Sequence, residues 1–190
     1  MKSFMPCYRF VGINPGQQGA VAIIDGNSRV LSKKLMPLES NRKDVDIRRL
    51  RLILTDLVTE SQEHLYLCIE KDTATAEQGN HSTAYKMGFN NAIPIVAASV
   101  LGLRHIVKPP IVWQKPFHAG KGERCGSPSD GKKELARIKS EKAARGLWPH
   151  DSLTSDNSRG QTPNHRVVDA LLLAEFCRRH FLNLENGGGK

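Results

Sequence analysis

Three polar side chains end or interrupt apolar stretches of this sequence. Asn14 follows an apolar run at 8–13, and Glu70 ends the run HLYLCIE. Asp169 lies within HRVVDALLLAEF, where it breaks an apolar helix face. An unpaired charge on such a face is costly, so Asp169 is informative even alone. We expect a folded sheet to bring the three side chains together.

A histidine joins this set, because His165 lies four residues before Asp169 and projects on the same side of a helix. Gathered carboxylates suit hard divalent cations, and Mg²⁺ usually shares its oxygen ligands with substrate phosphates. Two such ions about 3.5–4 Å apart can activate a water and stabilise the leaving 3′ oxygen of a phosphodiester. The set therefore predicts phosphodiester hydrolysis.

Each feature also has a simpler interpretation. Glu70 could be a solvated strand end, and a basic helix is often only a solvated face. The turn GINPGQQG could close a plain hairpin or bind phosphate. Its glycines would let the backbone and a phosphate approach each other closely. Taken together, in this order and with this charge, the features favour a nuclease.

The apolar patterns predict the elements that position these residues. In chain order we expect strands at 8–13, 20–24 and 29–36, a helix over 44–61, a strand at 64–70, a helix over 81–101, a strand at 104–108, a basic helix over 132–145 and a final amphipathic helix over 164–184. Pro94 should kink or break its helix, and 119–131 should form a mobile loop. The order predicts an α/β fold with a mixed sheet and helices on its faces, in one domain over 1–190.

The amino-acid composition indicates which kind of partner the protein binds and in which compartment it is expected. The 190 residues carry a formal net charge of +9, which favours a polyanion, nucleic acid before membrane. No apolar run is long enough to span a membrane, and the first ten residues lack a secretory signal. The four cysteines are scattered without a CxxC pair, which argues against a disulfide framework and favours an intracellular protein. Cys68 and Cys177 are expected to be buried.

A basic insert at about 115–145 is the expected site of DNA contact. It holds nine Lys or Arg residues against four acids. The candidate phosphate contacts are Lys115, Lys121, Arg124, Lys132, Lys133, Arg137 and Lys139. Such contacts supply salt-dependent affinity and little sequence information.

The ordered motifs resemble those of RuvC-type Holliday-junction resolvases. GINPGQQGAVAIID is similar to their first-strand motif GIDPGxxGA, LCIEK to their second acidic strand, and NHRVVDALLLAEFCRR to their last helix. The middle of the chain, including the stretch PPIVWQK, is similar to phage RuvC-like and chloroplast resolvases. The resemblance covers most of residues 8–182.

This resemblance implies an RNase H-like fold with a five-stranded sheet and a homodimer. It also implies Mg²⁺- or Mn²⁺-dependent nicking of opposing strands of four-way junction DNA, with two ions per site. Asn14 stands at the first metal-binding Asp, Glu70 at the second acid and Asp169 at the last. His165 fits the polar position one turn earlier, although it could instead only cap the helix. Lys86 and Phe89 lie in a region that touches the junction in resolvases, although a position in the core is the favoured interpretation for Phe89.

Two departures from the resolvase pattern stand out. Asn14 has an amide where the family has a carboxylate, so it can coordinate Mg²⁺ but neither neutralises nor bridges ions. The exchange is of the kind made to hold a nuclease on uncut substrate, so the sequence favours an engineered inactivation over a natural substitution. The stretch 120–131 has no counterpart that we can place.

Rival functions remain open at this point. One is another RNase H-like nuclease, of exonuclease or transposase type, which would cut duplex or hybrid as fast as junctions. Another is a catalytically silent junction-binding protein in which Asn14 is natural. An actin-like phosphotransferase would need a second nucleotide motif, and we find none.

Overall fold

The computed structural model describes residues 8–41, 44–61, 64–71, 81–118, 130–156, 158, 160 and 162–185. Its elements are β1 Arg9–Asn14, β2 Ala20–Asp25, β3 Val30–Leu35, α1 Ile47–Ser61, β4 Leu65–Glu70, α2 His81–Val100, β5 Arg104–Lys108, α3 Pro110–Trp113, α4 Asp130–Leu147 and α5 His165–Glu185. Every predicted strand and long helix is present, with ends shifted by a few residues. The short helix α3 is an addition.

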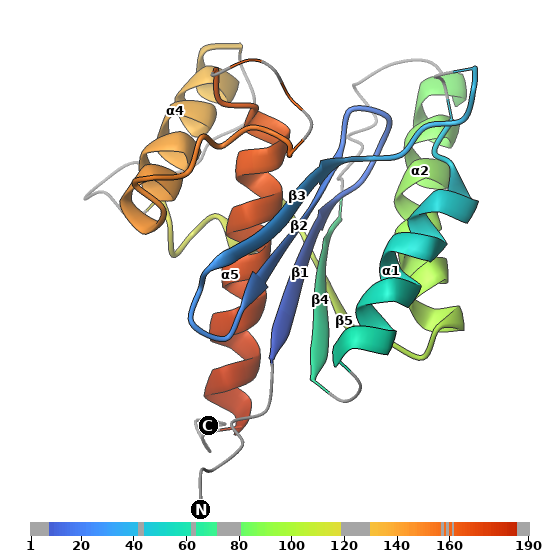
Figure 1. Ribbon diagram of the computed structural model, residues 1–190. Coiled ribbons are helices and arrows are strands. Elements are labelled where there is room, and N and C mark those ends of the chain that lie inside the picture. The colour runs from blue at the N-terminus through green and yellow to red at the C-terminus, as the bar shows by residue number, and fades with distance from the viewer. Residues whose placement is uncertain are drawn as a thin grey trace, which may run out of the picture.

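One mixed five-stranded sheet, in the order β3-β2-β1-β4-β5, forms the centre of the molecule. The pairs β1–β2 and β2–β3 are antiparallel, whereas β1–β4 and β4–β5 are parallel. Helices α1 and α2 cover one face, and α5 with α4 covers the other (Figure 1). This arrangement confirms the predicted fold class. No described helix is long and apolar enough to cross a membrane.

Strand alternation divides the interior into two apolar cores. Phe10 belongs to the core under α5, whereas Val11 and Ile13 belong to the core under α1 and α2. Because side chains alternate along a strand, Gly12 and Asn14 share the α5 face with Phe10. The central strands are buried on both sides, which explains their nearly continuous apolar sequences. Cys68 and Cys177 are buried as predicted.

Three local predictions were wrong in part, namely the break at Pro94, the end of the loop before α4 and the amphipathic character of the last helix. Helix α2 runs through Pro94 without interruption, since Ile93 and Ala97 are buried in one core on either side of the proline. Helix α4 begins at Asp130, inside the segment predicted as a loop, and 119–129 lies outside the described residues. Helix α5 is buried around most of its circumference, because the sheet, α3 and α4 all contact it. The apolar side chains of α5 are therefore not confined to one side, and the predicted amphipathic pattern is weak.

Candidate active site

Asn14 and Glu70 end two adjacent parallel strands at the same edge of the sheet. Ile13 on β1 pairs with Ile69 on β4, so the next residue of each strand occupies the neighbouring position. Cys68 lies in the core under α5, and Glu70, two residues on, has its side chain on that face too. The register therefore places the amide of Asn14 and the carboxylate of Glu70 side by side, facing α5.

A glycine lets α5 approach this edge closely. A Cβ atom on Gly12 would lie 2.0 Å from the Ala170 carbonyl oxygen and 2.4 Å from the Ala174 nitrogen, which no side chain could tolerate. Asp169 precedes Ala170 on the helix. The close packing at Gly12 thus holds the turn of α5 that carries Asp169 against β1, the strand that ends at Asn14.

The turn after Asn14 is closed by its own backbone. Gly16 has a φ of +97°, which favours glycine. A Cβ on Gly19 would lie 2.1 Å from the Asn14 carbonyl oxygen, and the Gly19 N–H donates to the Gly16 carbonyl at 2.9 Å. Gly19 is therefore required by the turn itself, whereas nothing lies within 4 Å of the Cβ position of Gly16.

The start of α5 is held by a separate set of contacts. The Asn164 side-chain oxygen accepts a hydrogen bond from the Arg166 N–H at 3.0 Å, and the Asn164 N–H donates to the Leu153 carbonyl at 3.0 Å. Asp151 pairs with the ammonium of Lys33 on β3, which fastens the preceding loop to the sheet. Asn164 is thus the helix cap, so the capping role considered for His165 belongs to its neighbour.

The charges around Asp169 set its protonation. Burial raises the pKa of Asp169 to about 6, although Arg166, a hydrogen bond from Ser140 and Arg137 act in the opposite direction. Burial, Arg166 and Arg137 lower the pKa of His165, so its imidazole is neutral at pH 7. A neutral imidazole is the form that binds metal ions.

Several buried nitrogen atoms near this site have no hydrogen-bond partner. They are Asn14 Nδ2, His118 Nδ1, His165 Nε2 and Arg166 Nε. Leaving a buried polar atom unpaired costs about 1–3 kcal/mol, so such atoms seldom gather without a reason. Rotating the Asn14 amide would present its oxygen in place of its nitrogen. Each of these nitrogen atoms is available for a hydrogen bond to a water or a ligand.

The donor types at this site fit a divalent cation. Two carboxylates, one amide and one neutral imidazole are available from Glu70, Asp169, Asn14 and His165. Within the described residues, however, no three His, Cys, Asp or Glu side chains are grouped closely enough to hold a metal. With an amide at Asn14, the set has one negative charge fewer than the resolvase pattern provides.

Two residues that the sequence analysis missed lie beside Glu70. The Trp113 indole N–H donates to Glu70 Oε2 at 2.9 Å, and Trp113 is completely buried. Lys108 pairs in register with Glu70 across β4 and β5. Both residues stand in stretches that the sequence analysis considered. Only the folded structure connects them to Glu70, Lys108 through the strand register and Trp113 through its hydrogen bond.

The predicted DNA contacts are distributed unevenly. Arg137 and Lys139 lie on α4, where Arg137 acts electrostatically on both His165 and Asp169, and Lys115 is exposed after α3. Lys132 and Lys133 lie in the first turn of α4 and Lys86 on α2, but their side chains are not described. Lys121 and Arg124 lie outside the described residues.

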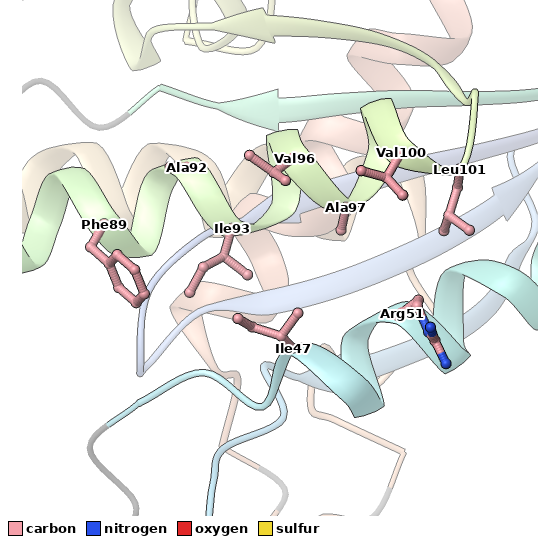
Figure 2. A pocket seen from close by; sticks show the side chains of 9 residues that line it. All are labelled: Ile47, Arg51, Phe89, Ala92, Ile93, Val96, Ala97, Val100 and Leu101. Carbon is pink, nitrogen blue, oxygen red and sulfur yellow. The ribbon is translucent and has the colours of Figure 1, made fainter.

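Phe89 is part of a different feature. It is 50% exposed, stacks with Tyr85 at a centroid distance of 6.4 Å, and does not belong to the core. Figure 2 shows it at an apolar groove of about 290 Å³ between α1 and α2, with its ring toward Ile47. This groove lies on the sheet face opposite α5. Phe89 therefore lies away from the face that carries the acids.

We expect Asp169→Asn to stabilise the protein in a pH-dependent way. The folded state raises the pKa of Asp169 from 3.8 to about 6, so ionisation of this group opposes folding. This cost is absent below about pH 4 and fully present above about pH 6, where it approaches 3 kcal/mol. Thermal unfolding in EDTA should therefore show a higher midpoint for Asp169→Asn at pH 7.5 and little change at pH 4. An equal effect at both pH values would contradict this origin.

Comparison with known proteins supports the fold. No family model matches the chain, and no curated protein matches it. Among solved structures it is similar to "T. thermophilus RuvC in complex with Holliday junction substrate", with a TM-score of 0.55 and 15% identity over 96% of this chain and 98% of that one. It is also similar to "Thermus thermophilus RuvC structure", with a TM-score of 0.55 and 16% identity over 94% and 96%. At such identities the likeness establishes the RNase H-like fold.

Proposed function

We propose that this chain is a RuvC-like Holliday-junction resolvase, a structure-selective endonuclease that nicks opposing strands of four-way DNA junctions. One observation supports the proposal. The register places Asn14 and Glu70 side by side at one sheet edge, and α5, which carries Asp169, packs against β1 at Gly12, in the fold of a Thermus thermophilus RuvC solved in complex with a Holliday junction substrate. The residues would form a single nuclease domain with the basic insert at about 115–145.

Glu70 and Asp169, with the Asn14 amide and the neutral His165, would hold two Mg²⁺ or Mn²⁺ ions. Such ions supply an activated water and charge stabilisation for the leaving 3′ oxygen. The chain's own residues prepare this site: Trp113 orients Glu70, and Arg166 with Arg137 attracts the phosphate backbone. Burial excludes water from Asn14, which is 2% exposed, so charges act more strongly there.

The amide at Asn14 implies that this form of the protein cleaves slowly or not at all. It keeps the shape of an aspartate and removes the charge that would neutralise a cation. This feature also favours a second candidate function, a silent junction-binding protein with the same fold. Restoring the carboxylate by Asn14→Asp and assaying junction, linear duplex and RNA–DNA hybrid with Mg²⁺ separates the two candidates and tests for a less selective nuclease.

A homodimer is part of the proposal because a two-fold junction is cut most simply by a two-fold protein. The apolar groove between α1 and α2 offers a surface for the second copy. Val96 and Val100 are 57% and 78% exposed there, and contact with another chain would remove them from water (Figure 2). This groove is on the sheet face opposite α5, so its occupation would leave the acidic edge accessible to DNA.

We expect the double substitution Lys132→Ala with Lys133→Ala to weaken junction binding and to reduce its salt dependence. For every phosphate that is no longer neutralised, the slope of log K against log salt should become shallower by about 0.9. Binding should be measured in EDTA between about 50 and 200 mM salt. The matched control, Arg48→Ala with Arg49→Ala, removes the same charge from α1 on the opposite face and should leave the slope nearly unchanged. Equal slopes for both double variants would place the start of α4 away from DNA.

A further inference from the structure

Ser140 connects α4 to the candidate site through a buried hydroxyl. The residue is 2% exposed and hydrogen-bonds to the Asp169 carboxylate. On its other side, Ser140 Oγ lies 3.0 Å from His118 Nε2. The three residues thus form a chain of side chains from the segment after α3, through α4, to α5.

The donor and the acceptor in each of these hydrogen bonds follow from which atoms carry a proton. An ionised carboxylate only accepts hydrogen bonds, so Ser140 must donate its single hydroxyl proton to Asp169. The Ser140 oxygen can then only accept from His118, which must carry its proton on Nε2. Burial and Lys139 lower the pKa of His118, so the ring is neutral and Nδ1 carries no proton. This assignment agrees with Nδ1 being buried without a donor partner.

We infer that Ser140 is a positioning residue that fixes the orientation of the Asp169 carboxylate, and that His118 holds the Ser140 hydroxyl in turn. The inference depends on the proposed function in one respect, which is the divalent metal ion that Asp169 would bind. Outer hydrogen bonds of this kind orient ligands and typically change metal affinity by about 10–100-fold. Ser140 also lies on the helix that carries Arg137 and Lys139. These hydrogen bonds therefore link the basic helix α4 to Asp169.

The first test is a double-mutant cycle of unfolding free energies in EDTA at pH 7.5. Ser140→Ala should destabilise the parent protein but cost much less when Asp169→Ala is already present. Thr154→Val is the matched control, because it also removes a buried hydroxyl but contacts Ser152 instead. Its cost should be the same in both backgrounds. Additive costs for Ser140→Ala and Asp169→Ala would overturn the positioning role, whatever the metal does.

The second test measures Mn²⁺ affinity in the Asn14→Asp background. Ser140→Ala should weaken binding about tenfold or more, whereas Ser140→Thr, which keeps the hydroxyl, should restore it. His118→Gln can still reach Ser140 with its amide and should bind nearly normally, but His118→Phe should not. Unchanged affinity in Ser140→Ala would overturn the inference. Absence of Mn²⁺ binding in Asn14→Asp itself would instead count against the proposed metal site, while the unfolding cycle still decides the role of Ser140.

Discussion

The Asn14→Asp variant should cleave a synthetic four-way junction with Mg²⁺ about 10²–10³-fold faster than the chain with asparagine. Asn14 is buried at the end of β1, next to Glu70 in the strand register, and a carboxylate there would add a negative charge to the proposed metal site. Removing one preorganised electrostatic group from an active site commonly costs this factor. Single-turnover cleavage of an end-labelled junction gives the rates directly.

The control must add one negative charge without touching the site. Asn183→Asp does so at an exposed position near the far end of α5 and should leave the rate unchanged. If Asn14→Asp with Mg²⁺ leaves the junction intact, the enzyme interpretation fails and the silent binding protein is favoured. Equal cleavage of linear duplex or hybrid would favour another RNase H-like nuclease.

The same variant also reports on the number of subunits that act together. A cruciform in a supercoiled plasmid becomes linear when both opposing strands are nicked in one encounter, and becomes an open circle after one nick. A homodimer with two sites is expected to produce the linear form directly. Accumulation of open circles before linear product would argue against a coordinated dimer.

Glu70→Gln in the Asn14→Asp background should reduce cleavage at least about 100-fold while junction affinity stays within about threefold or rises. The substitution removes the charge and keeps the shape, and the glutamine oxygen can still accept from Trp113, which should preserve the local fold. Losing the negative charge also relieves repulsion of phosphate. Cleavage rates with Mg²⁺ and binding in EDTA should therefore be measured on the same junction.

Glu39→Gln provides the matched control, since this exposed residue precedes α1 and its neutralisation should change neither quantity. Parallel losses of binding and cleavage in Glu70→Gln would show that Glu70 supports the structure instead of the reaction. A fall in the unfolding midpoint of the metal-free protein would point the same way.

Local patterns in the sequence were sufficient for the elements of the fold. Alternating and continuous apolar runs marked the five strands, and helical spacing marked the long helices, because burial imposes these periods on neighbouring residues. Polar residues at run ends identified Asn14 and Glu70 as candidates. The predictions failed where packing overrides a local preference, as at Pro94, whose helix continues between buried residues on both sides.

The contacts between segments far apart in the sequence could be identified only from the tertiary structure. The absence of a side chain at Gly12 is meaningful only because Ala170 lies against it, 158 positions along the chain. Trp113 became a partner of Glu70, Ser140 a partner of Asp169, and His118 a partner of Ser140, through hydrogen bonds that no spacing rule predicts. A residue's type limits which bonds it can form, but the packing of sheet and helices selects the partner. The chemistry could therefore be proposed from the chain alone, whereas the orientation of its acids could not.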